Sequence, residues 1–149
     1  MAEHPEPLVV VLAEDDSEDR ALVRTALLEL ERSSDLFCVG DGAQLIDYLE
    51  HRGDFSDAAR FPRPDLILMD LDMPEMSGDE ALRRIRANPE RRDIPIAVMT
   101  GRAVSRELAA TLAGASVFSK PFEFDDLVLL LHNLMVLVET QKGLLEAPE

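Results

Sequence analysis

Five short segments of the chain have the pattern of buried β-strands. They cover residues 8–13, 36–39, 66–70, 94–99 and 116–119. Most are apolar without polar alternation, which is typical of strands that are buried on both faces of a parallel sheet. The run at 66–70 is the central one, because it leads directly into Asp70 and the chain then breaks at Met73-Pro74.

Apolar residues with helical spacing lie between these strands. They predict helices over 17–32 with Ser17 as N-cap, around 45–49, from about 81 to 87 after a turn at 76–78, within 104–113, and from 125 to at least 138. This alternation predicts an α/β fold, a doubly wound five-stranded parallel sheet with helices on both faces. Right-handed crossovers and the chain length favour the flavodoxin-like strand order 2-1-3-4-5. We expect a flexible lead at 1–7, one domain at 8–140 and a tail at 141–149.

Composition narrows the possible partners and compartments. The chain has 149 residues, 46% of them hydrophobic, and a formal net charge of −15 from 30 acidic and 15 basic residues. This charge argues against nucleic acid as a partner, since phosphate backbones require a basic surface. No apolar stretch is long enough for a membrane span and no signal-peptide pattern is present, so we expect a cytoplasmic protein.

Charged and polar residues gather where the predicted strands end. Glu14 and Asp15 follow the first strand, Asp70 ends the third, and Thr100 and Lys120 follow the fourth and fifth. The carboxyl ends of parallel strands lie at one edge of a sheet, so we expect these side chains to be neighbours. Three crowded carboxylates favour a bound cation, and an all-oxygen site suits Mg²⁺. With a lysine and a threonine nearby, the site predicts phosphoryl transfer onto the central carboxylate.

The chain resembles the receiver domain of bacterial two-component response regulators over most of its length. The matching motifs lie at residues 11–16, 69–78, 98–101 and 119–122. The resemblance implies that Asp70 accepts phosphate from a sensor histidine kinase. It further implies Mg²⁺ bound by Asp15, by Glu14 through water, by Asp70 and by the backbone carbonyl of Asp72. Such a chain is a phosphoacceptor that catalyses its own phosphoryl transfer and slow dephosphorylation, and it is not a conventional enzyme.

The resemblance also implies roles for residues around the phosphoryl group. Lys120 would pair with its oxygens and Thr100 would donate a hydrogen bond to one of them. The peptide bond between Lys120 and Pro121 would be cis. Arg102 would lie on the rim of the site, where an arginine can shield the phosphoryl group from water.

Two features connect the chain to the single-domain regulators of bacterial phytochromes. They are the long connection at 52–65 and the extended C-terminus, after which we expect no output domain. One position departs from the receiver pattern, because Val117 stands where receivers usually have an aromatic switch residue. Phe118 is adjacent, but neighbouring residues of a strand point to opposite faces.

An alternative is a phosphohydrolase of the haloacid-dehalogenase type, because Asp70 and Asp72 also resemble the acid pair of that family. That family needs a further acidic motif after the lysine. Only Glu123, Asp125 and Asp126 follow Lys120, and they stand at the beginning of a predicted helix, where acids favour the helix N-terminus.

The last predicted helix is apolar almost all round. Residues 127–131 and 134–138 are all hydrophobic. A helix on a sheet buries only one stripe, so its outer face needs another cover. We expect a homodimer with two-fold symmetry through this helix, the alternative being a cover supplied by the same chain.

Overall fold

The computed structural model describes residues 6–101, 103–112 and 114–146, in which strands and helices alternate. The elements are β1 (Leu8–Ala13), α1 (Ser17–Leu28), β2 (Ser34–Val39), α2 (Gly42–Glu50), the short 3-10 helix η1 (Gly53–Phe55), β3 (Leu66–Asp70), α3 (Gly78–Ala87), β4 (Ile96–Thr100), α4 (Arg106–Thr111), β5 (Ser116–Ser119) and α5 (Phe124–Glu146). The predicted alternation of strands and helices is therefore confirmed.

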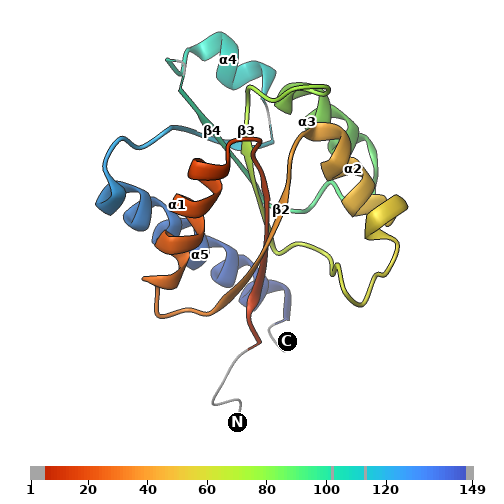
Figure 1. Cartoon of the computed structure of the whole chain (residues 1–149), viewed down its shortest axis with the longest axis horizontal. Helices are drawn as coiled ribbons and strands as arrows, with labels where there is room; N and C mark the ends of the chain where they lie inside the picture. The colour runs from red at the N-terminus through yellow and green to blue at the C-terminus, as the bar shows by residue number, and fades with distance from the viewer. Residues whose placement is uncertain (1–5, 102, 113, 147–149) are drawn as a thin grey trace.

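The five strands form one parallel sheet in the order β2-β1-β3-β4-β5, as the sequence predicts. Every residue of β3 is buried, because helices cover both faces of the sheet. Figure 1 shows α1 and α5 on one side of the sheet and α2 and α3 on the other. This arrangement is the doubly wound fold, and it leaves the carboxyl ends of the strands at one edge.

Side chains of each strand alternate between two hydrophobic cores. Val11, Ile67 and Met69 face the core beneath α2 and α3. Leu12 and Leu68 face the core beneath α1 and α5. Both cores contain aliphatic side chains from neighbouring strands, so the sheet is a stable base for the side chains at its edge.

The N-cap of helix α1 lies one residue earlier than the sequence predicts. Asp16 is the N-cap, and its carboxylate accepts hydrogen bonds from the backbone N–H groups of Glu18 and Asp19 at 2.8 and 3.1 Å. The prediction of Ser17 was wrong because aspartate caps a helix as well as serine does.

The last helix extends further than the predicted domain boundary at residue 140, since α5 continues to Glu146. Its final turns are attached to the sheet through Asp65. One oxygen of Asp65 lies 3.1 Å from the Lys142 ammonium, and the other accepts a hydrogen bond from the N–H of Val9 at 2.8 Å. Among the described helices, including this one, none has the length and apolar character needed to cross a bilayer.

The connection between α2 and β3 is held by aromatic packing. Tyr48 of α2 contacts Phe37 of β2 and both Phe55 and Phe61 of the connection, with ring centroids 5.5 to 5.9 Å apart. The Tyr48 hydroxyl also donates a hydrogen bond to the carbonyl of Pro62 at 2.8 Å. These contacts place the connection over the α2 side of the molecule, away from the strand ends that carry the acids (Figure 1).

Candidate functional site

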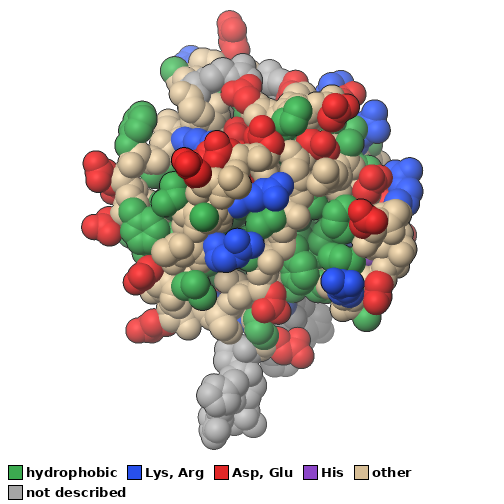
Figure 2. Space-filling view, in the orientation of Figure 1, with side chains coloured by type: hydrophobic (Ala, Val, Ile, Leu, Met, Phe, Trp, Pro, Cys, Tyr) green, Lys and Arg blue, Asp and Glu red, His purple; other side chains and the backbone are tan. Residues whose placement is uncertain are grey.

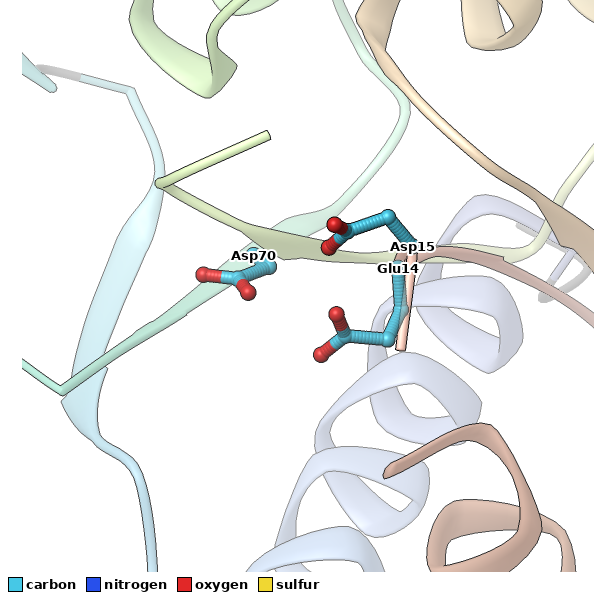
Figure 3. Close-up of side chains that lie close together, drawn as sticks. All are labelled: Glu14, Asp15 and Asp70. Carbon is cyan, nitrogen blue, oxygen red and sulfur yellow. The ribbon is translucent and has the colours of Figure 1, made fainter. Parts of the chain in front are cut away.

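Three carboxylates meet where β1 and β3 end. Glu14 and Asp15 follow β1, and Asp70 is the last residue of β3. One ligand oxygen from each lies within 4.8 Å of the others. Figure 3 shows the three carboxylates gathered around a common space. The predicted convergence of these acids is confirmed.

The environment of these acids differs from one to the next. Glu14 and Asp70 are buried, whereas Asp15 is exposed. Burial raises the pKa of Glu14 to about 7 and the charge of Asp70 contributes to the rise, although hydrogen bonds from the Asp16 amide and Lys120 oppose it. A buried acid of this kind is stabilised in its charged form by a cation.

The donor set suits a hard divalent cation. All three ligands are carboxylate oxygens, and the exposed side at Asp15 leaves room for water ligands, which Mg²⁺ and Mn²⁺ favour. The N–H of Asp72 donates to Oδ1 of Asp70 at 3.1 Å, which fixes the carboxylate from the loop that follows β3. These residues therefore fit a divalent metal site.

Lys120 completes the site from the end of β5. Its ammonium nitrogen lies 3.1 Å from Oε1 of Glu14, 3.3 Å from Oδ2 of Asp70 and 2.9 Å from Oδ2 of Asp19. Burial lowers the pKa of Lys120, but hydrogen bonds to Asp19 and Glu14 and the charge of Asp70 outweigh burial and hold that pKa above its usual value. The lysine is therefore a permanent positive charge beside Asp70, as predicted.

Asp19 is a residue of the site that the sequence motifs did not reveal. It stands in the first turn of α1, the helix that follows the carboxyl end of β1 after residues 14–16. That position was the available signal, since an acid in the first turn of such a helix lies near the same edge of the sheet.

Thr100 lies at the end of its strand, as the sequence predicts, whereas the cis bond predicted before Pro121 is not found. Thr100 is fully buried as the last residue of β4, and its carbonyl accepts a hydrogen bond from the backbone N–H of Lys120 at 2.8 Å. The prediction of a cis bond before Pro121 was wrong, because none of the described peptide bonds is cis. The trans form is the lower in energy for a bond before proline, and here it already allows Lys120 to reach Asp70. Arg102, predicted on the rim, lies outside the described residues.

The two residues before the end of β5 point to opposite faces of the sheet, as predicted. Val117 packs against the core of α2 and α3. Phe118 packs against the core of α1 and α5. The face on which receivers usually carry an aromatic switch residue therefore has an aliphatic side chain in this protein.

Comparison with known proteins identifies the family. Residues 10–132 match the response regulator receiver domain. The chain belongs to this family. The resemblance inferred from the motifs is confirmed.

Relatives of this receiver include proteins of known structure. Response regulator Rcp1 of Synechocystis sp. is 35% identical over 94 residues, which cover 63% of this chain and 62% of Rcp1. Response regulator RPA3017, described in red light signaling of R. palustris, matches with a TM-score of 0.77 and 27% identity over 85% of this chain and 90% of its own. An Mn²⁺-bound form of Rcp1 matches with a TM-score of 0.71 and 26% identity over 96% and 98%.

The haloacid-dehalogenase alternative finds no support in this receiver. The acids that join Asp70 come from the end of β1. Asp125 and Asp126 follow Lys120 and stand in the first turn of α5. Their negative charges stabilise the positive N-terminal end of that helix. Among the described residues, the acidic cluster contains no member from that segment.

Proposed function

We propose that this receiver takes a phosphoryl group from a sensor histidine kinase onto Asp70, in a reaction that requires Mg²⁺. One observation carries the proposal. Asp70 is a buried carboxylate that lies within ligand distance of two other acids and 3.3 Å from a lysine ammonium. Such surroundings are suited to a group that gains negative charge when it is phosphorylated.

Each residue of the site has a distinct role in the proposed phosphoryl transfer. An oxygen of Asp70 attacks phosphorus, the P–N bond of the phosphohistidine breaks, and the imidazole of the kinase leaves. Lys120 stabilises the charge on the transferred oxygens, and Thr100 binds one of them from the end of β4. Glu14, Asp15, Asp70 and the carbonyl of Asp72 would hold Mg²⁺, which supplies further charge neutralisation when bound. The same residues would catalyse slow hydrolysis of the phosphorylated state.

The kinase partner that we propose is a bacterial phytochrome, in the cytoplasm, where a kinase has access to ATP. The likeness to RPA3017, described in red light signaling, supports a light-sensing partner. The connection at 52–65 and the long α5 support the same group of regulators.

Transfer from a phosphorylated histidine kinase tests the assignment of Asp70. The wild-type chain should take up base-labile label in Mg²⁺ and none in EDTA. Asp70→Asn should take up none, whereas the matched control Asp72→Asn, an acid two residues away, should remain labelled. Label on Asp70→Asn at the wild-type level would contradict the proposal.

We also propose a homodimer through α5. Three large hydrophobic side chains lie on its outer face, Leu129, Val136 and Leu137, with 48 to 57% of their surface exposed. Figure 2 shows hydrophobic side chains among acidic ones on the side where α1 and α5 lie. A second copy would cover such residues at a symmetric interface.

Light scattering tests the dimer. Leu129→Glu and Leu137→Glu should give folded monomers, because each places a charge in the proposed interface. Ala87→Glu, an exposed position at the end of α3, adds the same charge on the other side of the sheet and should remain dimeric. Folded dimers of both leucine variants would place the interface elsewhere.

A further inference from the structure

Lys120 contacts one acid that is outside the metal-binding cluster. Asp19 Oδ2 lies 2.9 Å from the ammonium nitrogen, closer than the oxygens of Glu14 and Asp70. Its own backbone is fixed, because its N–H donates to the capping carboxylate of Asp16 at 3.1 Å. The ion pair therefore ties the first turn of α1 to the lysine of the phosphorylation site.

The ammonium of Lys120 has no spare donor for another acceptor. A lysine ammonium carries three N–H donors, and three carboxylates lie within hydrogen-bond distance of it. A phosphoryl group on Asp70 brings additional acceptor oxygens to the same place. For Lys120 to bind one of them, it must give up one of its present hydrogen bonds.

The exposure of the three carboxylates indicates which hydrogen bond is given up. The Glu14 side chain is 3% exposed and that of Asp70 is 12% exposed, so neither gains much hydration if the lysine leaves. The Asp19 side chain is 36% exposed, so water can replace the lysine there. Leaving a buried charge uncompensated costs far more than leaving a hydrated one.

We propose that Asp19 is a positioning residue that holds Lys120 in the unphosphorylated protein and competes with the phosphoryl group for its ammonium. Phosphorylation then breaks the contact between Lys120 and the first turn of α1. The inference rests on the proposed function, since it assumes that Asp70 is the residue that carries the phosphoryl group.

The lysine content of the chain permits a direct measurement. Lys120 and Lys142 are its two lysines, so protein labelled with ¹⁵N-lysine has two ammonium resonances to observe by NMR. Lys142→Arg assigns them, because it removes one resonance and keeps a cation beside Asp65. Beryllofluoride, which binds a carboxylate as a phosphoryl analogue, is titrated in Mg²⁺ while the Lys120 resonance is followed.

Asp19→Asn removes the competing charge and keeps the size of the side chain. We expect it to shift the Lys120 resonance of the analogue-free protein and to tighten beryllofluoride binding about fivefold, which corresponds to about 1 kcal/mol. Asp19→Glu restores the carboxylate and should return the affinity toward the wild-type value. Glu18→Gln removes an acid from the same helical turn that does not contact Lys120, and should change the affinity less than about twofold.

Each other outcome overturns the proposal. Equal or weaker binding by Asp19→Asn would mean that Asp19 does not compete with the phosphoryl group. Equal tightening by Glu18→Gln would mean that only the general charge of α1 matters. An unchanged Lys120 resonance in analogue-free Asp19→Asn would mean that the ion pair is absent in solution. Failure of the wild-type chain to bind the analogue would instead contradict the proposed role of Asp70, on which this inference depends.

Discussion

Replacing Glu14 by glutamine should stabilise the metal-free protein at alkaline pH. Glu14 is only 2% exposed, and burial raises its pKa to about 7 from an ordinary value of 4.5. Below pH 4.5 the carboxyl is protonated in both the folded and the unfolded chain, so it costs nothing. As pH rises from 4.5 to about 7 the unfolded chain loses the proton first, and stability falls. Above that range the full cost of the buried charge remains.

The size of this cost follows from the two pKa values. Their difference, about 7 minus 4.5 or about 2.5, corresponds to about 3 kcal/mol of unfolding free energy. Glutamine is neutral at every pH and keeps an oxygen that can accept from Lys120 and from the Asp16 amide. The contact of the charged carboxylate with Lys120 is already included in this difference, because it opposes the rise of the pKa. The net gain of Glu14→Gln at about pH 8 should therefore be about 3 kcal/mol.

Urea unfolding in EDTA measures this gain. Far-ultraviolet circular dichroism is the suitable probe, because the chain has no tryptophan and one tyrosine. Glu14→Gln should match the wild type at about pH 4 and exceed it at about pH 8, and Mg²⁺ should stabilise the wild type more than the variant. Glu18→Gln serves as the control for losing one surface acid. A variant that is less stable than the wild type at the alkaline pH, or a difference that is the same at both pH values, would refute the reasoning.

Three further predictions concern two glycines and one tyrosine. Gly42→Ala should destabilise the fold by about 2 kcal/mol or more, because its Cβ would lie 2.6 Å from the carbonyl oxygen of Met76, a backbone atom in the loop that follows Asp70. Gly143→Ala, whose Cβ meets nothing within 4 Å, should stabilise α5 by about 0.5–1 kcal/mol, and thermal unfolding compares the two. Tyr48→Phe should cost about 1 kcal/mol, because the carbonyl of Pro62 loses its hydrogen bond. Hydrogen exchange in that variant should accelerate in residues 53–62 more than in the sheet, and uniform acceleration would contradict a local role.

The strands and the central site could be predicted from the sequence for two physical reasons. A strand such as β3 that is buried on both faces must be apolar throughout, so an acid at its end is conspicuous. In a parallel sheet the strand ends share an edge, so the order of strands and helices along the chain is enough to bring Glu14, Asp70 and Lys120 together.

The remaining features depend on contacts that no local pattern contains. The ion pair between Asp19 and Lys120 joins residues 101 positions apart and depends on the conformation of the long lysine side chain. We expected a tail from residue 141, yet α5 continues to Glu146, and the contact of Lys142 with Asp65 holds that segment against the sheet. The isomer before Pro121 is decided by an energy difference of only about 0.5–1 kcal/mol, which the sequence does not reveal.

The most direct test of the central claim is to locate the phosphoryl group chemically. The chain is phosphorylated in Mg²⁺, treated with borohydride, which reduces an acyl phosphate to an alcohol, and then digested for mass spectrometry. We predict homoserine at position 70 in the phosphorylated sample and unmodified Asp70 in a sample incubated with EDTA. Homoserine in place of Asp15 or Asp72, with Asp70 unmodified, would contradict the account.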